Sequence, residues 1–322
     1  MIPRENSVPA AVDVVYTWVD GDDPAYGAVR NAWAGRYGLK PNPERDRDNL
    51  ELLRYSLRSL ERCLPWHGRL FIVTARPQIP SWLNLSPGRT GARIVHHDEI
   101  FADPEALPTF NSFAIEHNLP FIPGLSDPFL YLNDDHLFGA PVLPGDFLTP
   151  AGQVRLYLEK EAMPAYEEKE RLTDPYGRIV ANTNGWLDGR FGQARRRHLR
   201  HGPLWVAKGH MDREDPAVSR SIRNRFRSDS DIAFDLAYAH VLLSHPQRAA
   251  VVPLWEVYLR TAFLRITNDP AALKRELRWL GLLRPKFYCL NDDMGERPDP
   301  KVLALVRAFL ERTYPVKSRF EK

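Results

Sequence analysis

Short apolar runs, each followed by polar turn residues, organise the first 140 residues of the chain. Four runs rich in β-branched and aromatic residues predict buried strands over residues 12–19, 70–74, 93–96 and 129–132. Leucines recur at three- and four-residue steps over residues 50–64 and predict an amphipathic helix. A shorter helix is predicted over residues 112–117, with Asn111 or Ser112 as its N-cap. Strands that alternate with helices indicate an α/β domain with a mostly parallel sheet.

The second half of the chain has a different pattern. Residues 153–158 predict an edge strand, and the charged, irregular stretch after them predicts a loop or lid. Helical patterns follow at residues 232–243, 254–264, 271–280 and 301–310. We therefore expect one integrated unit in three parts: an α/β core over residues 1–158, a loop or lid over 159–200, and a mainly helical C-terminal extension over 201–322 packed on the core.

Composition narrows the class of protein. Apolar residues make up 43% and charged residues 26% of the 322 residues, as in soluble globular proteins. No apolar run approaches the roughly 18 residues of a membrane span, and the first residues have no secretory h-region. We expect a cytoplasmic protein. Cys63 and Cys289 lie far apart and outside any metal-type spacing, which favours buried free thiols.

Basic residues cluster over residues 195–201 and 220–227, although the net charge is only +3 and no nucleic-acid partner is expected. Such clusters are usually solvated faces; the functional alternative is a phosphate-binding surface. His201 in a Gly-Pro turn is either a surface residue or a phosphate contact or base. Arg227, and Arg54 on the flank of the first helix, either pair with phosphate or form surface salt bridges. A peripheral attachment to the inner membrane face through these clusters is a further expectation.

Acidic residues follow two of the predicted strands. In open α/β sheets, ligands bind beyond the carboxyl ends of the strands. Asp20, Asp22 and Asp23 follow the first strand, and Asp134 and Asp135 follow the fourth. A turn-forming role is favoured for Asp22 and Asp23. For Asp134 and Asp135 a divalent cation is favoured, because adjacent carboxylates repel unless a cation separates them.

Two further groups of residues leave alternatives open. The sequence Asn-Asp-Asp recurs at residues 291–293 after another apolar run, and it either completes the metal site through Asp292 or Asp293 or caps the last helix. Tyr16 and Trp18 in the first strand either stack a base or belong to the core. These residues alone indicate a metal-dependent enzyme that acts on a nucleotide or a phosphate.

Several motifs resemble the Stealth family of sugar-1-phosphate transferases. Residues 13–24 (DVVYTWVDGDDP) resemble the opening block of the family. Segments that resemble its later blocks follow in the same order as in the family. The later matches are residues 51–61, 71–74, 80–84, 107–112 and 129–135 for the second block, 201–203 and 226–231 for the third, and 286–293 for the fourth. Ordered matches over most of a chain are far more specific than one short motif.

This resemblance implies a Rossmann-like nucleotide-sugar transferase core. It also implies transfer of hexose-1-phosphate from a nucleotide sugar, typically a UDP-sugar, to a hydroxyl of an oligo- or polysaccharide, with release of a nucleoside monophosphate. The family includes bacterial capsular-polysaccharide phosphotransferases and the catalytic subunit of the lysosomal-enzyme N-acetylglucosamine-1-phosphotransferase. Two alternatives stay open: a metal-dependent glycosyltransferase that releases a nucleoside diphosphate, and a non-catalytic nucleotide- or carbohydrate-binding protein.

The resemblance and the residue chemistry together define a predicted site. We expect Mg²⁺ or Mn²⁺ as the cofactor, held by Asp134 and Asp135 with support from Asp292 or Asp293. The predicted catalytic residues are Asp134, Asp135, His201 and Arg227. The predicted substrate-binding residues are Tyr16, Thr17, Trp18, Asp20, Arg54, Asn111 and Ser112.

Overall fold

A five-stranded sheet forms the centre of the protein in the computed structural model, which describes residues 11–40, 50–86 and 91–322. The strand order is β3-β2-β1-β4-β9; the first four strands are parallel and β9 pairs antiparallel with β4. The strands are β1 (Val12–Thr17), β2 (His67–Thr74), β3 (Ala92–His96), β4 (Phe129–Asn133) and β9 (Leu204–Val206). The four strands predicted in the first half, and their mostly parallel arrangement, are confirmed.

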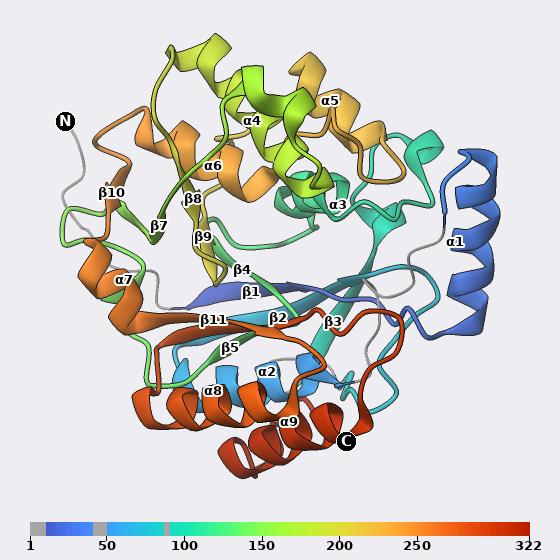
Figure 1. Cartoon of the computed structure of the whole chain (residues 1–322), viewed down its shortest axis with the longest axis vertical. Helices are drawn as coiled ribbons and strands as arrows, with labels where there is room; N and C mark the ends of the chain where they lie inside the picture. The colour runs from blue at the N-terminus through green and yellow to red at the C-terminus, as the bar shows by residue number, and fades with distance from the viewer. Residues whose placement is uncertain (1–10, 41–49, 87–90) are drawn as a thin grey trace.

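Helices cover both faces of this sheet. In Figure 1, α3, α4, α5 and α6 lie above the sheet, and α2, α8 and α9 lie below it. The leucine stripe predicted for the first helix is confirmed, since Leu53, Leu57 and Leu60 of α2 are fully buried in the main core. The helices are α1 (Pro24–Arg36), α2 (Leu52–Cys63), α3 (Ser112–Asn118), α4 (Pro175–Phe191), α5 (Pro216–Arg223), α6 (Phe234–Leu243), α7 (Leu254–Arg260), α8 (Pro270–Leu283) and α9 (Pro300–Thr313).

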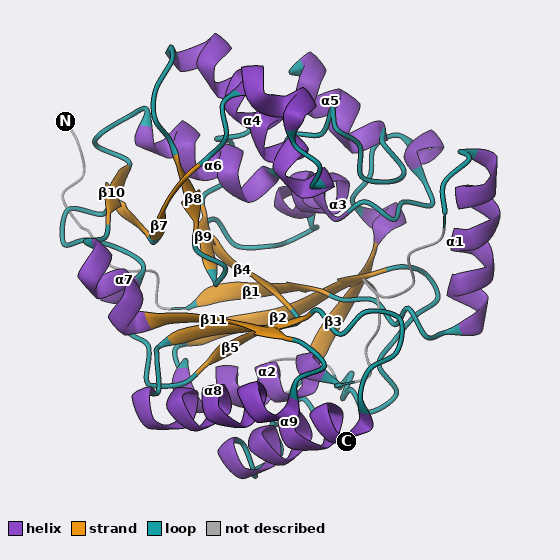
Figure 2. Ribbon diagram, in the orientation of Figure 1, coloured by secondary structure: helices purple, strands orange, loops and turns teal. Residues whose placement is uncertain are grey.

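Smaller elements complete the chain, and Figure 2 shows how strands, helices and loops are distributed. The predicted edge strand over residues 153–158 is β6 (Val154–Leu156), which pairs with β10 (Ala249–Val251). The 3₁₀ helices include η2 (His97–Glu99), η3 (Pro104–Ala106), η4 (Leu119–Phe121), η5 (Pro144–Asp146) and η6 (Tyr166–Arg171). Within the described residues, no helix combines the length and the apolar character needed to cross a membrane.

The segment predicted as a loop or lid over residues 159–200 is largely regular structure, so that prediction is wrong. It contains β7 (Leu158–Ala162), η6, α4 and β8 (Arg197–Leu199), and β7 pairs antiparallel with β8. The missed signal is Asp174-Pro175. The carboxylate of Asp174 accepts from the first amides of α4, and proline fits the first helical position because its missing N–H has no partner to lose. The same Asp-Pro start opens α1, α5, α8 and α9.

A second sheet was not predicted. It has the order β11-β12-β5, formed by β11 (Thr261–Ile266), β12 (Phe287–Asp292) and β5 (His136–Phe138). The helix predicted over residues 254–264 therefore ends at Arg260, where β-branched and aromatic residues favour a strand. The mainly helical C-terminal part is confirmed for α6, α8 and α9. The second sheet brings residues near the C-terminus beside the acidic turn after β4.

Candidate active site

The turn after β4 lies at the carboxyl edge of the central sheet. Asn133 ends β4, and its Oδ1 accepts hydrogen bonds from the Thr17 hydroxyl at 3.1 Å and the Tyr131 hydroxyl at 2.6 Å. Thr17 ends β1 and is paired in register with Asn133. The structure therefore places Thr17, a predicted substrate-binding residue, beside the turn that contains Asp134 and Asp135, both partly exposed.

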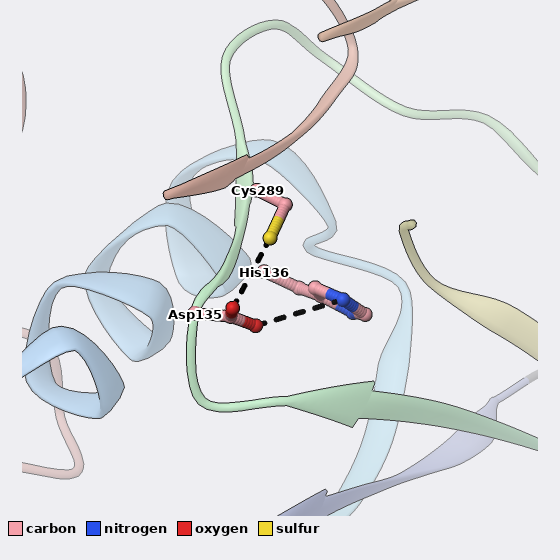
Figure 3. A group of neighbouring side chains, drawn as sticks. All are labelled: Asp135, His136 and Cys289. Carbon is pink, nitrogen blue, oxygen red and sulfur yellow. Dashed lines mark hydrogen bonds and ion pairs between the residues drawn. The ribbon is translucent and has the colours of Figure 1, made fainter. Parts of the chain in front are cut away.

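Asp135 is contacted by two segments of the chain (Figure 3). Its Oδ2 accepts a hydrogen bond from the Cys289 thiol at 3.1 Å, and its backbone carbonyl accepts one from Leu290 N at 3.0 Å. Its Oδ1 lies 3.6 Å from Nε2 of His136. The apolar run before the second Asn-Asp-Asp motif is thus brought directly against the first motif, which is one of the two arrangements that the sequence left open.

Burial keeps the two neighbours of Asp135 uncharged. Burial lowers the pKa of His136 to about 4, against the opposing charge of Asp135. Burial, the charge of Asp135 and the hydrogen bond to it raise the pKa of the Cys289 thiol. Among the described residues, neither Asp135 Oδ1 nor His136 Nε2 has a partner within hydrogen-bond distance, although both atoms are buried. Unsatisfied buried groups of this kind are uncommon and often have a functional reason.

The two faces of β12 separate the residues of the second Asn-Asp-Asp motif. Tyr288 and Leu290 belong to the core formed with α8 and α9, and side chains alternate along a strand, so Asp292 shares their face. Asn291 shares the opposite face with Cys289. Asp292 Oδ1 accepts from the amide of the buried Met294. The alternation therefore favours Asn291 over Asp292 as the residue of this motif nearest Asp135.

Asp293, the other predicted supporting ligand, follows the end of β12. Its Oδ2 forms an ion pair with Arg265 Nε at 3.1 Å, and both side chains are about half exposed or more. This carboxylate thus has a structural partner of its own, and it is a weaker candidate for a metal ligand than Asp134 or Asp135.

His201 reaches the same region from the chain that leads into β9. Its exposed ring stacks on Phe263 of β11, with 5.0 Å between the ring centroids. Phe263 pairs in register with Cys289, the residue that contacts Asp135. The charge of His201 also contributes to the lowered pKa of His136. The structure therefore places His201 in the neighbourhood of His136, the residue that follows Asp135.

Arg227 lies over α3. Its Nη2 donates to the Ser112 hydroxyl at 2.5 Å, and its guanidinium lies 4.5 Å from the centre of the Phe113 ring. Two predicted site residues, Arg227 and Ser112, are thus in direct contact. The same contact places a fixed positive charge beside Glu116, one helical turn along α3.

Glu116 is a candidate site residue that the sequence analysis missed. Its side chain is buried, with only 6% of the residue exposed. Burial and the nearby charge of Asp235 raise the pKa of Glu116 to about 8, against the opposing effects of Arg227 and of hydrogen bonds with Tyr131 and Ser112. A glutamate inside the apolar run of residues 112–117 was the available signal, since buried carboxyls are rare and often functional.

Tyr131 joins the two halves of the site. Its hydroxyl contacts both Glu116 and Asn133 Oδ1. A continuous polar path therefore leads from Arg227 over α3 to the acidic turn after β4. Residues from β1, α3 and β4 line this path, and β12 meets its end at Asp135.

Three residues of the first block that were predicted to bind substrate have structural contacts. Tyr16 is fully buried and its hydroxyl lies 2.8 Å from Ser56 Oγ of α2, so stacking of a base on this ring is excluded. Trp18 is also a core residue, only 7% exposed. Asp20 organises the turn after β1: its backbone exchanges two hydrogen bonds with the Gln78 side chain, and its carboxylate accepts from the next turn amide.

Asn111 and Arg54 also have structural partners. Asn111 is fully buried, caps α3 and donates to Asp231 Oδ2 at 2.9 Å. Arg54 forms an ion pair with Glu321 at 2.7 Å on the α2 side of the sheet, whereas Arg227 lies on the α3 side. Of the two alternatives left open for Arg54, the structure shows the salt bridge, and its partner Glu321 lies far away in sequence.

Cavities add little to this picture. A cavity of about 1160 Å³ lies between α2, α8 and α9, and none of the predicted site residues lines it. A much smaller cavity of about 20 Å³ adjoins His201 and Phe287.

Comparisons with known proteins agree with the sequence motifs. Residues 11–38 match Stealth protein conserved region 1, residues 45–156 match conserved region 2, and residues 283–322 match conserved region 4. The chain is 36% identical to exopolysaccharide phosphotransferase SCO6023 of Streptomyces coelicolor, covering all of this chain and 54% of that protein. It is 34% identical to exopolysaccharide phosphotransferase CpsY of Mycobacterium tuberculosis, covering 99% of this chain and 60% of that protein. The chain thus spans less than two thirds of the length of these relatives.

Solved structures that resemble this one are glycosyltransferases. The galactosyltransferase LgtC aligns over 95% of this chain and 96% of its own, with 12% identity and a TM-score of 0.47. Mouse xyloside xylosyltransferase 1 aligns with 11% identity and a TM-score of 0.38, over 88% of this chain and 98% of its own. The three conserved regions together cover more than half of the chain in the family's order, so this protein belongs to the Stealth family.

Proposed function

We propose that this protein transfers hexose-1-phosphate from a nucleotide-diphosphate sugar to a hydroxyl of an oligo- or polysaccharide acceptor. A UDP-sugar is the favoured donor. The nucleoside monophosphate is the second product. Membership of the Stealth family and the name shared by the curated relatives, exopolysaccharide phosphotransferase, support the class of reaction.

One observation carries the proposal: three family regions that are far apart in sequence meet at one turn. Thr17 of region 1 donates to Asn133 of region 2, and Cys289 of region 4 donates to Asp135 of region 2. Residues from separate conserved regions that lie together at one edge of the sheet can contact the same substrate. The carboxyl edge of a parallel sheet is where such folds bind ligands.

The residues at this edge fit the expected divalent cation. Asp134 is partly exposed in the turn, and Asp135 offers a buried carboxylate oxygen without a hydrogen-bond partner among the described residues. Carboxylate oxygens are the ligands that Mg²⁺ and Mn²⁺ prefer. Asp134 and Asp135 would hold the ion, which would neutralise the diphosphate of the donor when bound.

In the proposed reaction, the acceptor oxygen attacks the β-phosphorus of the donor. The bond from that phosphorus to the bridging oxygen breaks, and the nucleoside monophosphate leaves with the electron pair. Such a reaction depends mainly on positioning and on compensation of negative charge. Arg227 supplies a permanent charge with a planar donor fork, and its contact with Ser112 fixes its orientation.

The proton of the acceptor hydroxyl needs a base. Besides Asp134 or Asp135 itself, Glu116 and His201 are the candidates; Glu116 is linked to the acidic turn through Tyr131, and His201 affects His136 beside that turn. Glu116 has a pKa of about 8, close to working pH, which suits a group that must both take and release a proton. We therefore assign this role to Glu116, and to His201 contact with the phosphoryl oxygens of the donor.

We place the reaction in the cytoplasm, where nucleotide sugars are made. A peripheral attachment to the membrane would depend on exposed residues of the basic clusters such as Arg195 and Arg220. Arg196 and Arg225 do not contribute, because both are buried; Arg196 is ion-paired with Asp188. Cell fractionation at low and high salt tests this part, and full recovery in the soluble fraction at low salt would exclude the attachment.

The released nucleotide tests the reaction. The protein is incubated with UDP-sugars, a panel of saccharide acceptors and Mg²⁺ or Mn²⁺, and the nucleotide products are separated by chromatography. We expect UMP in amounts equal to the phosphodiester formed, and none with Asp135→Asn. Release of UDP would instead indicate a glycosyltransferase that attacks the anomeric carbon. Tight donor binding with no product from any acceptor would favour a binding protein.

A further inference from the structure

Two buried side chains face the carboxylate of Asp135, one toward each oxygen. The Cys289 thiol donates to Oδ2 at 3.1 Å, and His136 Nε2 faces Oδ1 at 3.6 Å (Figure 3). Both residues come from the second sheet, where Cys289 of β12 and His136 of β5 are paired in register. The proposed function assigns no role to either residue.

We propose that Cys289 and His136 are positioning residues that hold Asp135 in one orientation for its divalent cation. This inference rests on the proposed function, in which Asp135 is a ligand of that cation. A carboxylate has about four acceptor positions, so each oxygen keeps one free after it meets a donor. Donors in the layer behind a ligand orient it, and their loss typically lowers metal affinity or activity about 10- to 100-fold.

The backbone sets the orientation of the His136 ring. Its Nδ1 lies 3.3 Å from Asn133 N, and an amide N–H can only donate. Nδ1 is therefore the acceptor of the neutral ring, and Nε2 carries the hydrogen that faces Asp135. Only 5% of His136 is exposed, so no solvent competes for this hydrogen. The 3.6 Å separation is longer than a hydrogen bond, and contacts of this kind commonly shorten when the ligand is bound.

The position of Cys289 is also held rigidly. It is 1% exposed, and the following residue donates its amide to the backbone carbonyl of Asp135. Two hydrogen bonds from consecutive residues therefore fix both the backbone and the side chain of Asp135. A reactive cysteine needs an exposed, ionised sulfur, and Cys289 is buried. A role as a hydrogen-bond donor to Asp135 therefore fits this cysteine better than thiol chemistry.

Substitutions that keep or remove the donors test the proposal. Cys289→Ser keeps an O–H donor, whereas Cys289→Ala removes it. His136→Gln places a side-chain N–H near the position of Nε2 and so keeps the donor toward Asp135. The shorter side chain in His136→Asn reaches only the position of Nδ1 and removes that donor. The matched control is Cys63→Ala, because Cys63 is an equally buried free thiol that donates to the carbonyl of Phe138 away from Asp135.

The first measurement is the affinity for Mn²⁺ alone, by electron paramagnetic resonance of the free ion, together with the thermal midpoint. We expect Cys289→Ala and His136→Asn to weaken Mn²⁺ binding about 10- to 100-fold, and Cys289→Ser, His136→Gln and Cys63→Ala to stay within about threefold of the unaltered protein. Equal losses for Cys289→Ala and Cys63→Ala, in step with their thermal midpoints, would reduce Cys289 to a packing role and overturn the proposal.

Two further outcomes separate this proposal from its premises. Binding of Co²⁺ that produces a thiolate charge-transfer band, lost in Cys289→Ser, would make the sulfur a direct ligand and overturn the positioning role. Absence of UMP from the unaltered protein would reject the proposed reaction, yet the Mn²⁺ affinities would still test the role of the two residues. Where UMP is formed, the same variants should raise the Mn²⁺ concentration needed for half-maximal rate by the factor seen in binding.

Discussion

The hydroxyl of Tyr131 lies 2.6 Å from Oδ1 of Asn133 and also contacts Glu116, so one phenol joins α3 to the acidic turn. Both residues that it contacts are at least partly buried, and each would lose a partner without it. The single phenol hydrogen is donated to Asn133 Oδ1 here and can turn to Glu116 when that carboxylate ionises. Because this contact lowers the pKa of Glu116, its loss should raise that pKa further.

Tyr131→Phe tests this link. We expect a fall in the free energy of unfolding of about 1–2 kcal/mol, since buried polar groups are left unsatisfied. If Glu116 is the base, kcat/KM rises with pH as its carboxyl group ionises. We expect the midpoint of this rise to move to higher pH in Tyr131→Phe. Tyr157→Phe is the control, because Tyr157 is similarly buried and donates to the carbonyl of Asp146. An unchanged pH profile in Tyr131→Phe would contradict the link.

Glu116 should govern the pH dependence of turnover. If its carboxylate is the base, kcat/KM rises with pH up to about 8 and is level above it. Glu116→Gln should lower kcat/KM by about two to four powers of ten and remove this rise. A rise that persists in Glu116→Gln with the same midpoint would assign the base to another group, and His201→Gln is the variant to compare.

The same residue should affect stability in a predictable direction. Burial raises the pKa of Glu116 from 4.5 to about 8, so the folded state favours the protonated form. The associated stability is complete below about pH 4.5 and is lost as the pH rises through about 8. The amide introduced by Glu116→Gln cannot ionise. The thermal midpoint of this variant should therefore gain on that of the unaltered protein from about pH 4.5 to about pH 8 and stay level above it, and a constant difference over this range would contradict the assigned pKa.

Arg227 should be needed for turnover more than for folding. Arg227→Ala should lower kcat/KM by about two to four powers of ten if the guanidinium contacts the transferring phosphoryl group. Arg227→Lys keeps the charge but loses the planar fork and should recover only part of the rate. Arg223→Ala is the control, since Arg223 is mostly exposed and its Nε lies 3.7 Å from Asp103. Less than about a threefold change in Arg227→Ala would remove Arg227 from the site.

Local signals were sufficient for the four parallel strands of the central sheet and for the position of the acidic turn after β4. The strands of the first half and the leucine stripe of α2 have strong periodicity, and the acidic turn follows directly from β4. Thr17, Asp135 and His201 could be connected because each adjoins a strand end or a recognisable motif. Fold and family thus follow from short-range patterns together with the order of the motifs.

Long-range pairing accounts for the errors. Arg54 was assigned to the phosphates because nothing near it in sequence shows that Glu321 takes its charge. Glu116 was overlooked because its raised pKa depends on burial in the folded chain and on Asp235, far away in sequence. β12 was not predicted because its apolar run is short, and short runs do not distinguish strand from helix.

The alternation along β12 leads to the last prediction, which concerns the metal. Asp292 shares the face of Tyr288 and Leu290, toward α8 and α9, whereas Asn291 shares the face of Cys289. An amide oxygen is a suitable ligand for Mg²⁺ or Mn²⁺. Asn291 is therefore the residue of this motif that can support Asp135 as a metal ligand, in place of the predicted Asp292 or Asp293.

Three variants separate the possibilities. Asn291→Ala should weaken Mn²⁺ binding about 10-fold or more and lower kcat/KM accordingly. Asp292→Asn keeps an oxygen that can accept from the amide of Met294, so binding and rate should stay within about threefold. Asp135→Asn should lower kcat/KM by at least about three powers of ten with a nearly unchanged thermal midpoint, because the amide keeps the shape of the carboxylate. A greater loss of Mn²⁺ affinity in Asp292→Asn than in Asn291→Ala would reverse the assignment, since it would require β12 to turn its other face toward Asp135 when the ion binds.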